Sequence, residues 1–238
     1  MTGSIARLTL AALLGRRRGL LLVVLPGGML VLAVLLRLFR PETESFAPDL
    51  LRQLGFAAIL PLVALVAGTG VIANEIDDGS IVHLLSKPVS RRRIVLVKAA
   101  VASAFVAALG VVPLMLTAVL LVPGQPRLAL GFGAGALLAG ATYTAIFIAL
   151  SVLTAHAVTA GLLYALLWES ALGGYVPGAR VLSVQQWGLA VVEQVAGGNS
   201  VDASVAIAFG AAALAVVTVA ALALAANRLR SLVLSSAA

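Results

Sequence analysis

The side chains that could do chemistry in this 238-residue chain gather in one short stretch. Between Asn74 and Lys98 the sequence carries eight charges, and an uncharged run of more than 18 residues lies on either side. The eight are Glu75, Asp77, Asp78, Lys87, Arg91, Arg92, Arg93 and Lys98. An Asp, Lys or Arg at the centre of a bilayer costs roughly 2.5 to 3.5 kcal/mol. This stretch therefore lies in water at a membrane face, where we expect it to meet another protein.

Catalytic and metal chemistry are not indicated. The chain has no cysteine, which excludes disulfides, thiolate metal sites and cysteine nucleophiles. The only lysines, Lys87 and Lys98, follow Ser86 and Val97, so no G-x-x-x-x-G-K-[ST] phosphate-binding loop exists. No paired carboxylates, metal-ligand cluster or Ser-His-Asp set falls at a workable depth. We expect a chain that is not an enzyme and has no catalytic residue, metal ion or cofactor of its own.

The composition is that of a polytopic membrane protein. The chain is 62% hydrophobic and 11% charged, with a mean hydropathy of +1.13, whereas soluble domains carry about 25% charged residues. The net charge of +7 does not indicate a nucleic-acid partner. Such a partner needs a wet basic surface, whereas most cations here flank apolar runs, as membrane topology signals do.

The pattern predicts an all-α domain over residues 1–238 with six transmembrane helices. Residues 1–18 are too short an apolar run to span the bilayer and predict an interfacial helix, or else a ragged extension of the first span. Residues 173–202 predict one or two short outer helices. The predicted spans are Gly19–Leu36, Leu54–Ala73, Ala99–Val122, two spans within Leu128–Leu172 joined by an inner turn near Ser151–Thr159, and Ala203–Ala226.

The distribution of cations predicts the orientation. With the N-terminus inside, the inner segments hold 11 of the 16 Lys and Arg residues and the outer segments hold five. By the positive-inside rule, both termini lie in the cytoplasm of a multi-pass protein of the plasma (inner) membrane. Residues 75–93 then form a cytoplasmic segment between spans two and three, and Lys98 can snorkel from the inner end of span three.

The cytoplasmic segment predicts a short helix with an apolar face. Asp78 can cap a helix from Gly79 to Ser86. Ile81, Leu84 and Leu85 then share one face, and Pro88 ends the helix. Ser90 can cap the next helix, whose first turn holds Arg91 to Arg93 where the dipole disfavours cations. Orientation or a partner must explain these arginines, because helix stability does not.

This stretch resembles a signature of type-2 ATP-binding-cassette (ABC) exporter permeases: a Glu, a Gly-Thr/Ser-Leu/Ile step, Leu-Leu-Ser-x-Pro-Val/Ile-Ser-Arg, and a later Lys. Ser80 stands where Thr is commoner. The matching residues are Glu75, Gly79, Ser80, Ile81, Leu84, Leu85, Ser86, Pro88, Val89, Ser90, Arg91 and Lys98.

The resemblance implies that residues 75–93 contain a coupling helix that docks into a separate ABC ATPase subunit. Two ATPase copies, which would bind ATP and Mg²⁺, and a second permease, identical or a sister chain, would complete the transporter in membrane lipid. Because few charges line the spans, we expect export of a hydrophobic or amphiphilic substrate. The residues expected to couple to the ATPase are Glu75, Gly79, Ile81, Leu84, Leu85, Pro88, Arg91 and Arg92.

Alternatives remain open at this stage. The charged stretch could be a topogenic loop, and the chain a non-transporting membrane anchor or assembly factor that docks a cytoplasmic partner. Glu169 could lie inside the membrane, as part of a substrate path or outer gate, or at the water boundary with Trp168 as an interfacial anchor. His83 and His156 fit an interface residue and a turn residue better than proton relays.

Overall fold

The computed structural model describes residues 18–39, 44–71, 91–172, 177–197 and 201–235, and these residues form helices joined by short turns with no strand among them. The all-α prediction is therefore confirmed. Within the described residues, five helices are long and apolar enough to cross a membrane: Leu22–Phe39, Ala47–Gly70, Arg92–Leu121, Pro126–Leu153 and Ile207–Leu229. The predicted interfacial helix and most of the charged segment lie outside the described residues.

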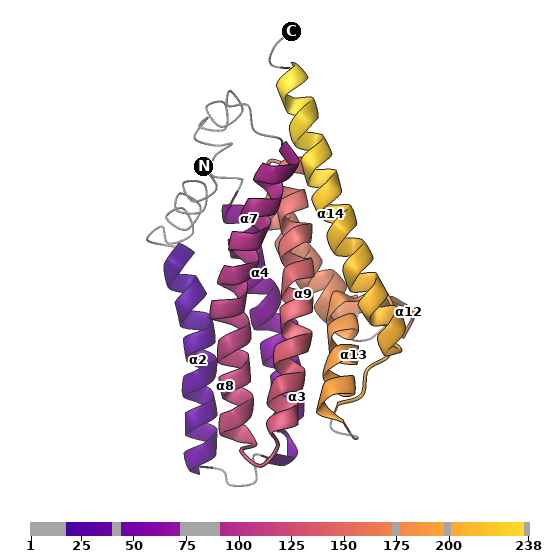
Figure 1. Ribbon diagram of the computed structural model, residues 1–238. Coiled ribbons are helices and arrows are strands. Elements are labelled where there is room, and N and C mark those ends of the chain that lie inside the picture. Colours follow the sequence, from indigo (N-terminus) through magenta and orange to yellow (C-terminus); the bar gives the residue numbers. More distant parts are fainter. Residues whose placement is uncertain (1–17, 40–43, 72–90, 173–176, 198–200, 236–238) are drawn as a thin grey trace.

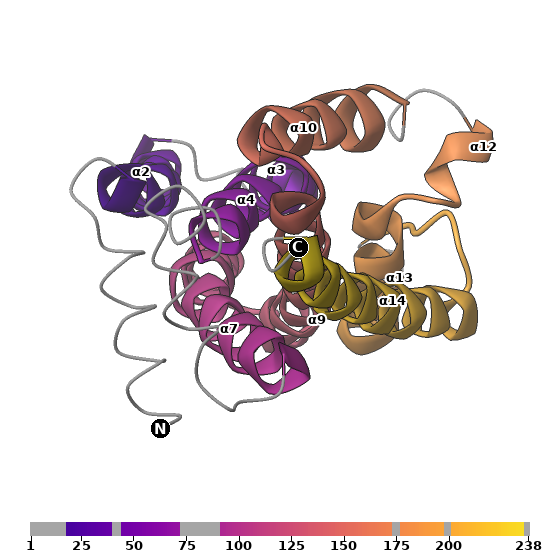
Figure 2. The same cartoon turned by 90° about the horizontal axis from the view of Figure 1, so that it is seen from above.

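The long helices form one bundle around α9 (Pro126–Leu153). α9 packs against α4 (Leu60–Gly70), α7 (Arg91–Val106), α8 (Val112–Leu121) and α14 (Ile207–Ser235). Seen from above, α2 (Arg18–Phe39) lies at the edge of the bundle (Figure 2), where its main neighbour is α8. The start of α2, the start of α7 and the end of α14 point toward the same end of the bundle (Figure 1). This is the end predicted to be cytoplasmic, and we call it the inner end.

Two spans contain π-helical segments, and each segment is followed closely by a proline. In the second span, α3 (Ala47–Leu50) leads into η2 (Leu51–Ile59), and Pro61 lies at the start of α4. In the third span, η3 (Ala107–Val111) separates α7 from α8, which contains Pro113. A proline removes one backbone donor and crowds the carbonyl four residues earlier, so the preceding turn widens while the helix continues.

Several element boundaries differ from the prediction. The second span begins at Ala47 rather than at the predicted Leu54, because Pro48 suits a first helical turn. The inner turn falls at Thr154–His156, within its predicted range. α14 continues to Ser235, beyond the predicted end of the sixth span at Ala226.

The predicted fifth span is shorter than a normal span. It consists of α10 (Ala157–Leu163) and the π-helical η4 (Tyr164–Leu172), and its apolar part, Ala157–Glu169, is below the length of the other five. The six-span prediction is thus confirmed for five long helices. α12 (Pro177–Arg180) and α13 (Val184–Ala196) follow it along the chain, within residues 173–202 where one or two short helices were predicted.

α13 lies inside the bundle, beside the outer half of α9 (Figure 1). Its residues from Val184 to Val192 are all buried. Gly131 and Gly135 of α9 face Val192 and Gly188 of α13, in antiparallel order. A Cβ on Gly135 would lie 2.5 Å from the backbone oxygen of Gly188, so only glycine permits this approach. Small residues at four-residue spacing bring membrane helices together in this way, and α13 therefore packs closely along the outer half of α9.

Candidate functional site

Glu169 is the buried acid of the bundle. Its side chain is 0% exposed, and among the described residues only Lys98 is a second buried charge. Glu169 interacts with Tyr143 of α9, which lies 17 residues from Pro126 and ten from Leu153. At 1.5 Å per residue these separations are about 25 Å and about 15 Å along α9. The carboxylate therefore lies within the bundle rather than at its surface, while its predicted role in a substrate path or outer gate stays a prediction.

Four donors surround the carboxylate, two on each oxygen. Oε1 accepts hydrogen bonds from the Tyr164 hydroxyl at 2.9 Å and from the Val184 N–H at 3.0 Å. Oε2 accepts from the Ser183 hydroxyl at 2.5 Å and from the Gln185 N–H at 3.2 Å. An ionised carboxylate accepts about four hydrogen bonds and donates none. The site therefore fits the anionic form, and its lone pairs are already occupied.

These donors come from the first turn of α13. Ser183 is the N-cap residue, with an extended backbone, and its hydroxyl accepts from the Gln186 N–H at 3.4 Å. The first N–H groups of a helix lack intrahelical partners and carry a partial positive charge. Glu169 satisfies two of them and compensates the dipole. The arrangement lets a helix begin inside the membrane without unsatisfied donors, which would cost several kcal/mol there.

Aromatic rings cover the carboxylate on the side of α9. Tyr143 stacks on Phe147 with ring centroids 6.2 Å apart, and Phe147 meets Tyr164 edge to face at 6.2 Å. The Tyr143 hydroxyl is fully buried and lies near Glu169. Sequence reasoning singled out Glu169 but missed Tyr143, Tyr164 and Ser183, since their meeting depends on how α9, η4 and α13 pack.

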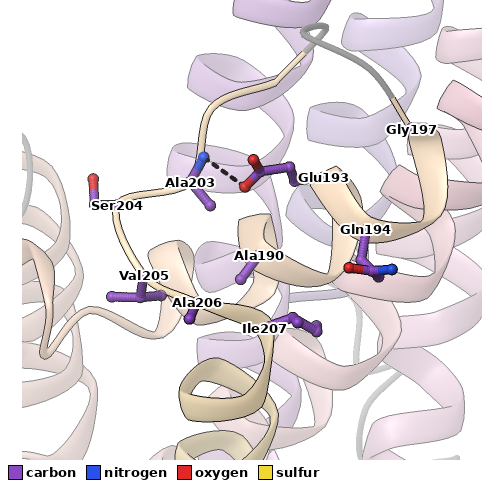
Figure 3. A pocket seen from close by; sticks show the side chains of 9 residues that line it. All are labelled: Ala190, Glu193, Gln194, Gly197, Ala203, Ser204, Val205, Ala206 and Ile207. Carbon is purple, nitrogen blue, oxygen red and sulfur yellow. Dashed lines mark hydrogen bonds between the residues drawn. The ribbon is translucent and has the colours of Figure 1, made fainter.

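The outer end of α13 borders an open pocket of about 710 Å³ (Figure 3). The pocket lies between this helix and the segment that leads into α14, with Glu193, Gln194 and Ser204 as its polar lining. The Glu193 carboxylate accepts from the Ala203 N–H at 3.1 Å, as Figure 3 shows. Among the described residues, no group of three or more His, Asp and Glu side chains could hold a metal ion.

At the inner end, α7 carries both exposed and buried cations. Arg92 and Arg93 are exposed in its first turn, as expected of residues flanking a docking segment. Lys98 differs from the prediction that it snorkels, because it is 1% exposed and its Nζ donates to the Val71 carbonyl at 2.8 Å. The carbonyls at the end of the second span attract it inward. His156 lies exposed in the inner turn, the position predicted for a turn residue.

Of the predicted coupling residues, only those at the start of α7 lie within the described residues. Arg91 is the first residue of α7, which starts where the capping pattern predicts. The other residues of this prediction lie outside the described residues: Glu75, Gly79, Ile81, Leu84, Leu85 and Pro88, together with His83.

A comparison with family models settles the family. The model of the ABC-2 family transporter protein matches residues 33–231, most of the chain. The chain belongs to the ABC-2 family. The match includes the charged segment, the buried carboxylate and α13. A search of curated proteins finds no match.

Membership of the ABC-2 family establishes the class of protein. The chain is an integral membrane protein and the permease subunit of an ABC transporter. ABC-2 permeases are generally non-catalytic transport components and normally work with an ABC ATPase partner.

Proposed function

We propose that this ABC-2 permease exports a hydrophobic or amphiphilic substrate across the plasma membrane. Two copies of an ABC ATPase would bind ATP and Mg²⁺ on the cytoplasmic side, and a second permease, identical or a sister chain, would complete the path. The observation that carries the proposal is the family match over residues 33–231, which includes the exporter-like pattern from Glu75 to Lys98.

The small number of charges in the spans favours an apolar or amphiphilic substrate over an ion. Lys98 and Glu169 are the buried charges of the described residues, and each has a hydrogen-bonded protein partner. Much of the remaining surface is apolar: only 11% of the most apolar window of α14 and 22% of that of α2 are buried. Surfaces of this kind suit lipid, a second permease or an amphiphile that moves along the bundle.

The proposed docking site is the segment of residues 75–93 on the cytoplasmic face. Its apolar residues Ile81, Leu84 and Leu85 would seat in a cleft of the ATPase, with the arginines at its rim. Full burial of each apolar side chain is worth roughly 1.5 to 3 kcal/mol. Exposed rim pairs contribute about 0 to 1 kcal/mol and are screened by salt. The apolar face would therefore dominate the affinity.

Transport is tested with the chain and the P-loop ATPase that co-purifies with it, reconstituted into vesicles. Vesicles with the ATPase outside should accumulate a fluorescent amphiphile when ATP and Mg²⁺ are added. An ATPase variant lacking its P-loop lysine is the matched control and should leave the dye distribution unchanged. Failure of any ATPase to co-purify from native membranes would refute the proposal and favour an anchor protein.

Docking is tested by two substitutions of opposite character. Leu84→Asp should release the ATPase from the detergent-solubilised complex at every salt concentration. Arg92→Glu should weaken the complex mainly at low salt, because Arg92 is exposed. Pro88→Ala and Glu75→Ala should preserve abundance but lower ATP-driven transport. A complex that survives Leu84→Asp but not Arg92→Glu would contradict the proposed apolar docking.

A further inference from the structure

We propose that Lys98 is a positioning residue that fastens together the two helices flanking residues 72–90, so that a force on this segment moves α4 and α7 as one unit. The inference rests on the proposed function, since it concerns how motion of the ATPase reaches the spans. It starts from an unusual feature: a lysine about two turns into a membrane-spanning helix whose charged end does not reach water.

Lys98 is distinguished from the other cations of its helix by burial. Its side chain is 1% exposed and is among the largest fully buried side chains of the bundle, whereas Arg92 and Arg93 are exposed. Val95 and Ala102, on the same face of α7, are also buried. The face that carries Lys98 therefore packs into the bundle, and α4 is one of the helices against which it packs.

The partner of Lys98 lies at the other end of the segment. Its Nζ donates to the Val71 carbonyl at 2.8 Å across 27 residues of sequence. Val71 is the C-cap of α4, where the last carbonyls of the helix lack intrahelical partners and carry a partial negative charge. A hydrogen bond from an ammonium group is shorter and roughly twice as strong as one between neutral groups. Lys98 thus ties α7 to the last turn of α4.

Stability alone does not explain a lysine at this position. Holding an ammonium group away from water costs free energy that a methionine of similar size would not cost. An apolar side chain, however, cannot donate a hydrogen bond to the carbonyl of a neighbouring helix. The lysine therefore fits a directional tie between two helix ends better than a packing role.

α4 and the third span also contact each other away from Lys98, so the two helices are held together at two levels. Farther toward the outer side, Gly110 of η3 approaches Leu60 and Val63 of α4, so the two spans also touch below Lys98. With both ends of the contact held, a push on residues 72–90 shifts the pair together. Without the bond at the inner end, the same push would spread α4 from α7 and less of it would reach the outer half.

The test uses Lys98→Met in the full permease–ATPase complex. Ala100→Met is the matched control, because Ala100 is exposed on the same helix and lies outside the docking segment. Lys98→Met should keep the ATPase bound and hydrolysing ATP, while the substrate moved per ATP falls several-fold. Lys98→Arg, which retains a charged donor, should recover part of this ratio, and Ala100→Met should leave it unchanged.

A second measurement needs no ATPase and separates this inference from the proposed function. Spin labels at Val66 of α4 and Leu96 of α7, neither of which is buried, report the distance between the two inner ends. Lys98→Met should broaden that distance distribution and Ala100→Met should not. A wild-type transport ratio or an unchanged distribution would overturn the inference. Loss of folded protein or of ATPase binding would also overturn it, because Lys98 would then serve folding or docking.

Discussion

The Ser183 hydroxyl donates a hydrogen bond of 2.5 Å to Oε2 of Glu169, although 14 residues separate them in the sequence. This bond joins the end of the short fifth span to the N-cap of α13. Since the Val184 and Gln185 N–H groups bind the same carboxylate, Glu169 fixes where α13 begins. The position of α13 in the bundle thus depends on one buried carboxylate.

Glu169→Gln should destabilise the folded protein. Each carboxylate oxygen accepts from one backbone N–H, so the new amide NH₂ must face one of these donors in either orientation. An unsatisfied buried polar group costs about 1 to 3 kcal/mol. Thermal unfolding in detergent, followed by tryptophan fluorescence, should show a lower Tm. Glu193→Gln is the control, because Glu193 is exposed and its amide oxygen can still accept from Ala203; equal Tm values for both variants would contradict the capping role.

Gly135→Ala should disrupt the contact between α9 and α13. The added Cβ would lie 2.5 Å from the Gly188 backbone oxygen and 2.6 Å from a Val192 methyl group. Overpacking of this kind typically costs about 1 to 3 kcal/mol. Gly28→Ala in α2 is the control, since nothing lies within 4 Å of its Cβ position. The yield of monodisperse protein on gel filtration should fall for Gly135→Ala alone, and an unaffected Gly135→Ala protein would disprove the close approach.

Thr142 and Thr218 should be energetically coupled across α9 and α14. Their hydroxyl oxygens are 2.8 Å apart, and either hydroxyl can be the donor. Each hydroxyl also lies within hydrogen-bonding distance of the carbonyl four residues earlier in its own helix, Leu138 for Thr142 and Leu214 for Thr218. Interhelical bonds of this type average about 0.6 kcal/mol and reach about 1.7 kcal/mol. A double-mutant cycle with Thr142→Val and Thr218→Val should give a coupling energy in this range. Thr144→Val, which affects only a bond within α9, should be additive with Thr218→Val.

The two turns at the ends of α9 should lie on opposite sides of the membrane. The chain has no native cysteine, so Gly124→Cys and His156→Cys place single thiols in exposed turns. An impermeant thiol reagent applied to intact cells should label Gly124→Cys and leave His156→Cys unlabelled until the membrane is opened. The reverse pattern would show that the predicted orientation is inverted.

Sequence patterns predicted what depends on hydropathy and left open what depends on tertiary contacts. The apolar runs located five long helices, and the 41-residue run without charge correctly required a turn near His156. The second span was predicted to begin only at Leu54, after the charged residues Asp49 and Arg52, although both of these residues are helical. Charge alone does not locate the start of a span, because charged side chains are compatible with the first turns of a membrane helix.

The candidate site was likewise predicted only in part from the sequence. Glu169 was recognised because an acid next to a long apolar run is rare, but its donors come from residues 164 and 183–185. Only the return of the chain into the bundle brings them together. Lys98 was expected to extend into water at the inner end of the third span, because its position in the sequence does not show which face of α7 is buried. In both cases the contacts depend on how one helix is rotated relative to its neighbours, which the sequence pattern does not give.

The π-helical segments of the second and third spans have a mechanical consequence. η2 ends at Ile59, directly before Leu60, and Gly110 of η3 lies close to Leu60 in the neighbouring span. A π turn with a proline soon after it has fewer regular backbone hydrogen bonds and bends more easily than the α-helix around it. Each of the two spans can therefore bend near this contact. The inner parts of the two spans, α4 and α7, can then tilt relative to the outer parts of the same spans.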